Sequence, residues 1–507
     1  MLFLLEDHRV PEANTIFEHQ RAFDRYAAMP VYAVNVALGF PQAFRDIEFA
    51  VTVFHYSLRP TGTWITTDID AYLKRATRTY KVAIFQDEIW YFKERLEFLN
   101  RYAIDCLYTR HKPKHWDEVY HGATALKKRV FYMAGYVATD MVDSARKLYL
   151  PQEARPIDVG YRGRRLPHYL GRGAQEKSEI GEKFLAHAND SGLKLDIAVD
   201  ESQRCYGAAW YHFLAKSKAV LGVEGGATVI DLEDRFRPKY YELIKETPNL
   251  TFDDFAERVG EDFLKLENRI DYRAFTPRHF EAAAFRNVQV LFEGHYDGLL
   301  TPNVHYVPLR KDFSNVAEVL AQLRDPVRTA ALTEQAYEDL IASGRYSYER
   351  FIRSFDEELA QAGVRLEKPD PALAARLQIY LDDWATFREG CVRIDNAINE
   401  AYRQHPHNLD NLLLAREMMQ CYAANRPFYP LTGNVHPSPM DMQAQDQAFF
   451  DRLCLIARCD LDVGAYKPSM LDLLKYMVAD SLSFAWRALR KLGRLGRSVA
   501  TGWRTEA

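Results

Sequence analysis

A cluster of basic residues lies between a predicted strand and a predicted helix in the middle of the chain. Guanidinium and ammonium groups form strong hydrogen bonds with phosphate, and they can stabilise a leaving diphosphate without a metal ion. Surface arginines are common, so the role of each single residue stays open, but the cluster predicts that at least one member binds phosphate. The members are Arg162, Arg164, Arg165, Arg172 and Lys177.

Two consecutive glycines, Gly225 and Gly226, follow a predicted strand that ends at Gly222. Glycine lets the backbone N–H groups of a loop approach phosphate closely, because it has no Cβ atom. A plain turn needs the same residues. The pair is therefore a second candidate phosphate contact, and a structural turn is an equal alternative.

Polar residues also follow two predicted strands in the first part of the chain. His55 follows the apolar run 50–54, and Asp87 and Glu88 follow the run 82–85. A carboxylate at a strand end can orient a hydroxyl group or accept its proton. A histidine there could bind a ligand hydroxyl or help to stabilise charge. The structural alternatives are a buried histidine with satisfied hydrogen bonds and ordinary loop carboxylates.

Short apolar strands that alternate with helices must position these residues. This alternation predicts mostly parallel sheets covered by helices on both faces. The predicted strands are 2–5, 31–36, 50–54, 82–85, 104–108, 129–131, 158–161, 195–199, 219–222, 288–292 and 305–309. The predicted helices are 15–26, 69–78, 92–102, 179–188, 211–218, 252–263, 315–323 and 327–343.

The length of 507 residues is too great for one hydrophobic core, so we expect two domains and an extension. The first α/β domain is predicted to cover residues 1–150. A linker at 151–156 leads to the second, which ends near residue 355. Strand patterns then disappear, and residues 356–507 are predicted to form a helical extension.

The stretch 276–311 combines a short helix, a buried strand, a glycine-containing loop and a second short strand. An open α/β sheet uses such units at its ligand edge, beyond the carboxyl ends of its strands. The stretch resembles the donor-site end of group 1 glycosyltransferases of the GT-B type, with the turn Gly298-Leu299-Leu300-Thr301-Pro302. The resemblance covers roughly residues 1–355 and extends to the CgeB-like enzymes of bacterial surface-polysaccharide clusters. Its other motifs are VFHYSL from Val53, IFQDE from Ile84, the segment 157–184, LGVEGGATVID from Leu221 and RYSYERFI from Arg345.

The resemblance implies a GT-B-like fold, in which two Rossmann-like domains face a cleft. The first domain would bind the acceptor and the second a nucleoside-diphosphate sugar. Glu281 would accept hydrogen bonds from the ribose diol, while its helix N-terminus faces the pyrophosphate. Tyr296 and Gly298 would lie at the same donor site. A second, sugar-facing glutamate is expected eight positions before Glu281, but that position is Arg273.

Composition narrows the possible functions. A formal net charge of -4 argues against a protein that binds nucleic acid over its surface. The six cysteines are scattered without a Cys-x-x-Cys pair, so neither a disulfide framework nor a zinc site is indicated. Asp68-Ile69-Asp70 has the letters of an Asp-x-Asp motif, but it precedes a predicted helix and is interpreted as its N-cap. We expect no metal requirement.

The last segment of the chain predicts contact with a membrane. Apolar residues recur there at spacings of three and four, which places them on one stripe of a helix. Basic residues lie beside this stripe, as in helices that bind anionic membrane surfaces. We therefore expect a cytoplasmic protein that contacts the inner face of the cell membrane through residues 482–503; a helix that packs back on the protein is the alternative. The apolar residues are Leu482, Trp486, Leu489, Leu492, Leu495 and Val499, and the basic ones are Arg487, Arg490, Lys491, Arg494 and Arg497.

The function expected from these features is transfer of a sugar from a nucleoside-diphosphate sugar to a surface-glycan acceptor, free or lipid-linked. The resemblance implies retention of anomeric configuration. Two alternatives stay open. One is a nucleotide-sugar epimerase of the same fold, which needs no acceptor, and the other is a non-catalytic polysaccharide-assembly protein with a degenerate site.

Overall fold

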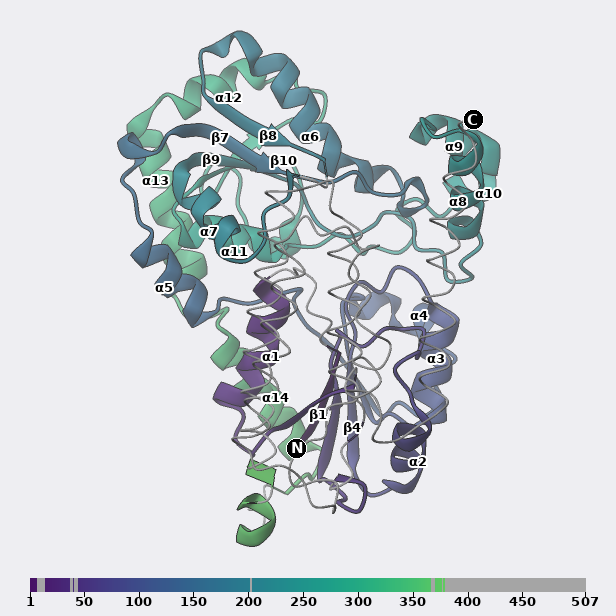
Figure 1. Cartoon of the computed structure of the whole chain (residues 1–507). Helices are drawn as coiled ribbons and strands as arrows, with labels where there is room; N and C mark the ends of the chain where they lie inside the picture. The colour runs from purple at the N-terminus through teal and green to yellow at the C-terminus, as the bar shows by residue number, and fades with distance from the viewer. Residues whose placement is uncertain are drawn as a thin grey trace, which may run out of the picture. The chain divides into compact units, whose positions relative to one another are not determined.

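The computed structural model describes residues 1–6, 14–36, 40, 44–200, 203–365, 370–375 and 377–378. The described residues up to 36 and from 47 to 365 form one compact unit, which contains two parallel sheets (Figure 1). The predicted segment 482–503, and with it almost all of the predicted extension 356–507, lies outside the described residues. Among the described residues, no helix has both the length and the apolar composition needed to cross a membrane.

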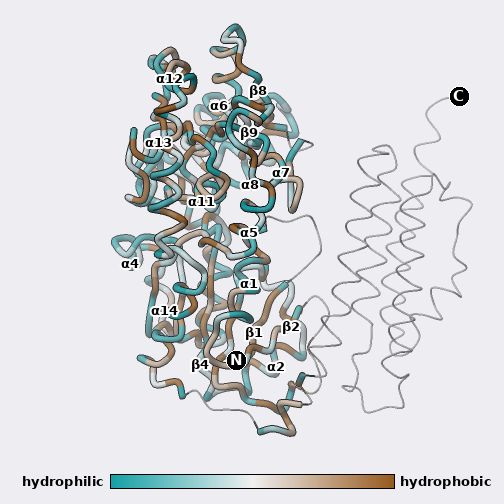
Figure 2. The backbone as a smooth tube through the Cα atoms, turned by 90° about the vertical axis from the view of Figure 1, so that its left-hand side faces the viewer, coloured by the Kyte–Doolittle hydropathy of each residue, from teal (hydrophilic) through white to brown (hydrophobic). Residues whose placement is uncertain are grey.

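The first sheet contains six strands in the order β2-β1-β3-β4-β5-β6, and each neighbouring pair is parallel. Every residue of β1, β3 and β5 is buried, as expected for parallel strands covered on both faces. Figure 2 shows the apolar character of β1 and β4. The strands are β1 (Leu2–Leu5), β2 (Tyr32–Asn35), β3 (Val51–Phe54), β4 (Tyr80–Ile84), β5 (Cys106–Thr109) and β6 (Lys128–Phe131).

The helices of this part lie on opposite sides of the sheet, with α1 on one side and α2, α3 and α4 on the other (Figure 1). Right-handed crossovers explain this, because the chain moves one way from β1 to β2 and the other way from β3 to β6. Thr66 caps α2 by accepting the N–H of Ile69, so Asp68 and Asp70 lie in the first turn and Asp68 is not the N-cap. The helices are α1 (Asn14–Tyr26), α2 (Thr67–Arg75), α3 (Phe92–Arg101), α4 (Trp116–Val119) and α5 (Thr139–Lys147).

The second sheet has five parallel strands in the order β11-β10-β9-β7-β8. Its core packs residues of β7, β9 and β10 against Ile180 and Phe184 of α6 and Val319 of α12. The strands are β7 (Ile157–Arg162), β8 (Leu195–Ala198), β9 (Ser217–Gly222), β10 (Val288–Phe292) and β11 (Val307–Leu309). The two sheets are those of the predicted GT-B-like fold with two Rossmann-like domains.

Three helices are inserted between β9 and α11 and pack around Phe236, Phe255 and Phe263. The predicted helix 252–263 is interrupted at Gly260, whose φ of +84° is left-handed and ends α9. The helices of the second part are α6 (Arg172–Ala188), α7 (Gly207–Lys216), α8 (Phe236–Glu246), α9 (Phe252–Val259), α10 (Glu261–Leu264), α11 (Pro277–Ala284), α12 (Val316–Leu323) and α13 (Pro326–Tyr337).

Helix α14 (Tyr348–Gln361) returns to the first sheet and packs beside α1. Phe355 contacts Phe23 edge to face, with ring centroids 5.1 Å apart. The carboxylate of Asp356 accepts the N–H of Ala28 at 2.9 Å. The described chain therefore crosses from the second sheet back to the first before residue 361.

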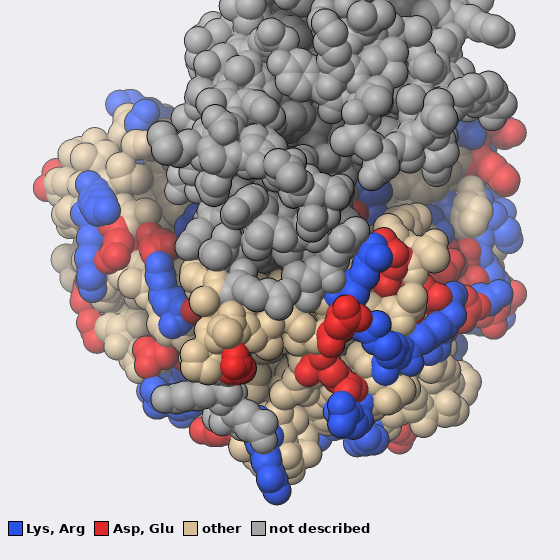
Figure 3. Space-filling model, turned by 60° about the horizontal axis from the view of Figure 1, so that its bottom comes forward, with Lys and Arg blue, Asp and Glu red and all other residues tan. Residues whose placement is uncertain are grey.

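Charged side chains of both signs lie side by side on the face shown in Figure 3. Ion pairs with an exposed basic member also occur in this part of the chain, for example Arg78 with Glu48 at 2.6 Å and Lys74 with Asp70 at 2.8 Å. Such pairs near the surface each contribute little to stability.

Candidate functional site

The strand order of the second sheet identifies its ligand edge. From β7 the chain crosses by α6 to β8 on one side, whereas from β9 it continues to β10 on the other. In such sheets ligands bind in the crevice beyond the carboxyl ends of the two strands where the direction reverses. Arg162 ends β7 and Gly222 ends β9, so the basic cluster and the two glycines both follow strands of this switch point.

Two predicted members of the basic cluster, Arg164 and Lys177, have no acidic partner among the described residues, and Arg278 of α11 joins them. Arg164 and Arg278 are exposed and Lys177 is half-buried. The pKa of Lys177 is lowered to about 8, mainly by burial and in addition by the positive charges of Arg164 and Arg278. A bound anion would relieve this repulsion. These three residues, called the cation trio below, are therefore the best phosphate-binding candidates in the described part of the chain.

The other predicted cations already have partners. The guanidinium of Arg162 lies 2.7 Å from Asp196 and also donates to the backbone oxygens of Tyr161 and Asp196. Arg165 pairs with Glu182 at 2.7 Å, and Arg172 pairs with Asp253 and stacks on Phe252. The structure thus divides the predicted cluster into free and paired members, a division that residue types alone cannot reveal.

The glycine pair packs against the segment that precedes α11. The N–H of Gly225 donates to the carbonyl of Ala274 at 2.8 Å and is therefore used within the protein. Gly226 has φ +89°, and a Cβ atom there would lie 2.2 Å from the carbonyl oxygen of Tyr272. These contacts favour the alternative of a structural turn for this pair.

Glu281 lies in α11 and is 6% exposed. Its Oε2 accepts the indole N–H of Trp210 at 2.8 Å. Burial raises the pKa of Glu281, while the hydrogen bond from Trp210 and the charge of Arg278 lower it. Arg278 thus contributes to both the cation trio and the electrostatics of Glu281, and this places a carboxylate beside the cations at one sheet edge.

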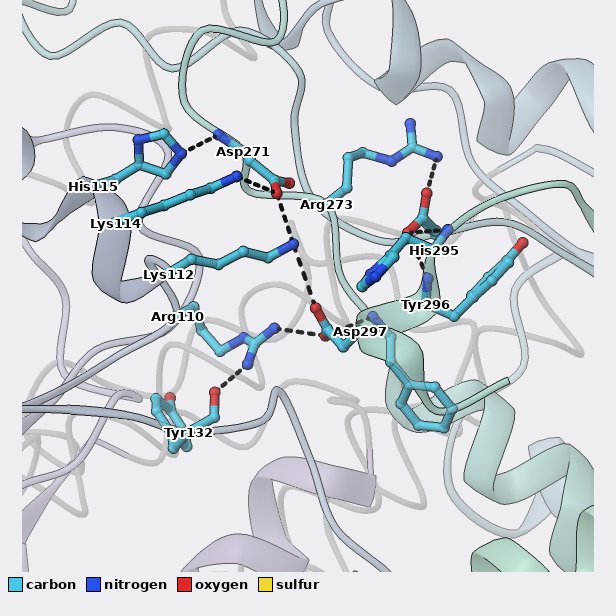
Figure 4. Close-up of polar contacts among 12 residues, drawn as sticks. Arg110, Lys112, Lys114, His115, Tyr132, Asp271, Arg273, His295, Tyr296 and Asp297 are labelled. Carbon is cyan, nitrogen blue, oxygen red and sulfur yellow. Dashed lines mark hydrogen bonds and ion pairs between the residues drawn. The ribbon is translucent and has the colours of Figure 1, made fainter. Parts of the chain in front are cut away.

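Arg273, at the position where the resemblance leads one to expect a glutamate, holds two carboxylates. Its guanidinium lies 2.5 Å from Glu176 and 3.5 Å from Glu224. Glu224 in turn accepts the backbone N–H groups of His295 and Tyr296 at 3.2 and 2.8 Å (Figure 4). Two carboxylates therefore do lie beside position 273, one from α6 and one from the loop after β9.

The predicted loop residues Tyr296 and Gly298 have different surroundings. Tyr296 is fully buried, and its hydroxyl donates to the carbonyl of Phe292 at 2.6 Å. Gly298 has φ +76° and ends a turn in which Tyr296 and Asp297 are also left-handed. The turn therefore has three successive residues with positive φ, and the buried ring of Tyr296 packs beneath it in the core. Tyr296 thus supports the turn and does not offer a ligand contact.

A basic loop after β5 of the first sheet reaches the second sheet, which the sequence analysis did not predict. Arg110 lies 3.4 Å from Asp297, and Lys112 lies 2.9 Å from Asp271 and 3.6 Å from Asp297 (Figure 4). Lys114 also pairs with Asp271. The run Arg-His-Lys-Pro-Lys directly after a strand is the signal that could have indicated this loop.

His55 lies at the switch point of the first sheet, between β1 and β3, and is 1% exposed. Its Nδ1 accepts the backbone N–H of Ser57 at 3.0 Å, so its proton is on Nε2, which faces Nδ1 of His19 at 3.0 Å. Burial lowers the pKa of both imidazoles. Both ring nitrogens of His55 are thus used inside the protein, which favours a structural role.

Asp87 and Glu88 point in different directions after β4. Glu88 is fully buried, and its carboxylate accepts hydrogen bonds from the Thr109 hydroxyl, the Tyr120 hydroxyl and the Arg110 N–H. Asp87 is exposed, and its carboxylate has no hydrogen bond or ion pair among the described residues. The charge of Asp87 raises the pKa of Lys177, opposing the larger effects that lower it. The structure thus brings Asp87, but not Glu88, into electrostatic contact with the cation trio.

Comparison with known proteins gives structural matches only. No protein-family model matches the chain. No curated protein matches its sequence. Solved structures similar to it include Anabaena HepE in complex with UDP, at 12% identity and TM-score 0.38, over 71% of this chain and 98% of that one. A Rickettsia africae glycosyltransferase is similar at 10% sequence identity and TM-score 0.40, over 71% of this chain and 97% of that one. The sucrose-phosphate synthase of Thermosynechococcus elongatus is similar at 11% sequence identity and TM-score 0.38, over 71% of this chain and 98% of that one.

Proposed function

We propose that this protein is a glycosyltransferase that moves a sugar from a nucleoside-diphosphate sugar to a surface-glycan acceptor, free or lipid-linked. One observation carries the proposal. Three basic side chains that have no acidic partner in the described part of the chain lie with the carboxylate of Glu281 at the switch point of the second Rossmann-like domain. Cations suit a diphosphate, and a buried carboxylate suits a ribose diol. Together they match the two polar ends of a nucleoside diphosphate.

In this proposal the cation trio binds the diphosphate and stabilises the charge that develops as the glycosidic bond breaks. Burial and the repulsion of Arg164 and Arg278 lower the pKa of the Lys177 ammonium, and a bound phosphate would relieve that repulsion. Fixed positive side chains of this kind replace a bridging metal ion, so the transfer is proposed to be metal-independent.

The acceptor is proposed to bind on the first domain. Asp87, whose charge acts on Lys177 and whose carboxylate has no hydrogen bond or ion pair within the described ranges, would orient the acceptor hydroxyl. His55 and Glu88 would hold the strand ends around it. Retention of configuration and a surface-glycan acceptor are proposed on the resemblance to group 1 enzymes of surface-polysaccharide clusters.

Product analysis tests this function. The full-length protein is incubated with UDP-, GDP-, ADP-, CDP- and dTDP-sugars, with and without lipid-linked or soluble glycans, in the presence and absence of EDTA. The proposal predicts acceptor-dependent release of nucleoside diphosphate and a glycosylated acceptor, with activity retained in EDTA. Conversion of the donor sugar without an acceptor would instead identify an epimerase. No turnover of any donor together with no binding of any nucleotide would identify a non-catalytic protein, and loss of activity in EDTA would contradict metal independence.

A further inference from the structure

The indole of Trp210 holds the carboxylate of Glu281 in one orientation. Trp210 lies in α7 and Glu281 in α11, and the indole N–H donates to Oε2 at 2.8 Å. Glu281 is 6% exposed, and this is the hydrogen bond that its carboxylate accepts among the described residues. An indole is rigid and has a single donor, so the contact holds Oε2 in place.

The indole itself is held by Arg278 and by Phe213, and Arg162 packs on the ring of Phe213. The ring of Trp210 stacks with that of Phe213, at 5.6 Å between centroids and 20° between planes. The guanidinium of Arg278 lies 5.0 Å from the centre of the indole, and that of Arg162 lies 4.3 Å from the centre of the Phe213 ring. Arg278 also donates to the backbone oxygen of Arg162, which ends β7. This layer of two arginines and two aromatic rings connects the end of β7 to Glu281.

We propose that Trp210 is a positioning residue: its indole N–H holds the carboxylate of Glu281 so that this protein binds a ribonucleoside diphosphate more tightly than the 2′-deoxy form. The proposal rests on the proposed function. A carboxylate with one oxygen held in place loses less side-chain freedom when it accepts hydrogen bonds from two adjacent hydroxyls than a freely rotating carboxylate does. The ribose 2′- and 3′-hydroxyls are such a pair. A 2′-deoxyribose has only one of them, so it leaves part of the buried carboxylate unsatisfied.

Binding measurements with paired nucleotides test this inference. UDP, GDP, ADP and CDP are each compared with their 2′-deoxy forms by calorimetry, using the full-length protein. For the bases that bind, we expect the ribonucleotide to bind roughly ten- to a hundredfold more tightly, which is the effect of one lost hydrogen bond to a charged group. Trp210→Phe keeps the ring but removes the N–H, and Glu281→Gln removes the charge. Both variants should reduce this ratio, because they affect the ribonucleotide, which has two hydroxyls facing the carboxylate, more than the 2′-deoxy form, which has one.

Trp116→Phe is the matched control. Trp116 also donates its indole N–H, to the backbone oxygen of His111 at 2.7 Å, and it also contacts an arginine, Arg129, at 5.7 Å. It lies in α4 of the first part of the chain. The loss of this indole hydrogen bond should leave the ratio of ribonucleotide to deoxyribonucleotide affinity unchanged, so any general effect of removing an indole N–H is separated from the effect at Glu281.

The pH dependence of ribonucleotide binding is a second readout. The hydrogen bond from Trp210 lowers the pKa of Glu281, so its removal should raise this pKa. As the pH is lowered, Glu281 should therefore become protonated, and ribonucleotide affinity should begin to fall, at a higher pH in Trp210→Phe than in the wild type. Two other titratable groups face Glu281, namely Glu18 of α1 and Tyr211 of α7. Both are present in wild type and variant, and the shift between the two profiles therefore reports on Glu281.

The binding and pH measurements separate the role of Trp210, the selection of ribonucleotides and the proposed function. An unchanged ratio and pH profile in Trp210→Phe, with a reduced ratio in Glu281→Gln, would overturn the role of Trp210. Equal affinity of the wild type for ribo- and deoxyribonucleotides would overturn the selection, although the proposed function would stand. If no nucleoside diphosphate binds the wild type, both the inference and the proposed function fail.

Discussion

The guanidinium of Arg110 lies 3.4 Å from the carboxylate of Asp297, and this ion pair joins the carboxyl edge of the first sheet to that of the second (Figure 4). Both side chains are almost completely buried, at 4% and 10% exposure. Asp297 also accepts the N–H of Phe275 at 3.0 Å. The contact thus connects three segments that are distant in sequence at the edge where the cation trio and Glu281 lie.

Replacement of Asp297 by Asn should destabilise the protein. Asn tolerates the left-handed backbone at this position and can still accept the N–H of Phe275, but it leaves the buried guanidinium of Arg110 without its charged partner. Loss of one partner of a buried pair costs about 3 kcal/mol. Urea denaturation followed by tryptophan fluorescence measures this loss.

Asp271→Asn is the control for that change. Asp271 is 34% exposed and pairs with Lys112 and Lys114, so its loss should cost no more than about 1 kcal/mol. Equal losses for the two variants would show that the burial of the Arg110–Asp297 pair is not what stabilises this contact.

His279 should make the protein less stable in acid. Burial lowers the pKa of His279 to about 4, whereas in the unfolded chain it is about 6.5. The unfolded state therefore binds more protons below pH 6.5, so the stability due to the neutral imidazole is complete above pH 6.5 and is lost as the pH falls toward 4. The loss is about 1.4 kcal/mol per pH unit.

His279→Asn isolates this effect, because Asn can still donate to Oε1 of Gln289 as Nδ1 of His279 does at 2.9 Å. The difference in unfolding free energy between wild type and variant should be constant from pH 7 to 8 and should shrink by about 2 kcal/mol at pH 5. A difference that does not change with pH would contradict the buried, neutral state of this histidine.

Binding of a diphosphate at the cation trio should be coupled to proton uptake. Lys177 has a pKa of about 8, so it is close to half-protonated at pH 8. A bound phosphate favours the charged form and raises this pKa. Calorimetry at pH 8 in buffers of different ionisation enthalpy should therefore reveal uptake of about half a proton per bound nucleoside diphosphate. No uptake at pH 8, or equal uptake at pH 6 and pH 8, would place Lys177 away from the phosphates.

The predicted membrane contact depends on the sequence pattern of residues 482–503, which lie outside the described residues. Each basic residue near an anionic surface contributes about 1 kcal/mol, and the apolar stripe adds burial in the interface. Full-length protein should sediment with vesicles that contain anionic lipid, and a variant truncated after residue 481 should not. Equal sedimentation of the two forms, or none of the full-length protein, would contradict this prediction.

The sequence predicted the strands well because parallel strands that are buried on both faces are short continuous apolar runs. β10, predicted at 288–292, has those bounds, and β7 differs from 158–161 by one residue at each end. Helix α6 begins at Arg172 rather than at residue 179. Its first turn packs Gly173 against Thr228 and Arg273, so tertiary contacts stabilise a segment whose glycines disfavour a helix.

The site was harder to predict than the fold, because charges in sequence do not reveal their partners. Arg162 and Arg164 are two positions apart, yet Arg162 is paired with Asp196 and Arg164 has no acidic partner among the described residues. Arg278 was missed because it lies 101 positions after Lys177. Trp210 was missed because it directly precedes the predicted helix 211–218, and only the fold brings its N–H to Glu281.

The most direct test of the central claim is the affinity of nucleoside diphosphates for wild-type protein, Lys177→Ala and Lys183→Ala. Lys183 lies on the same helix as Lys177 but is paired with Glu179 at 3.1 Å, so it controls for loss of a lysine from α6. We predict that the wild type binds at least one of UDP, GDP, ADP, CDP and dTDP, that Lys177→Ala weakens this binding roughly tenfold or more, and that Lys183→Ala leaves it unchanged. Equal affinities of the wild type and Lys177→Ala, or no binding of any of these nucleotides to the wild type, would contradict a donor site at the cation trio.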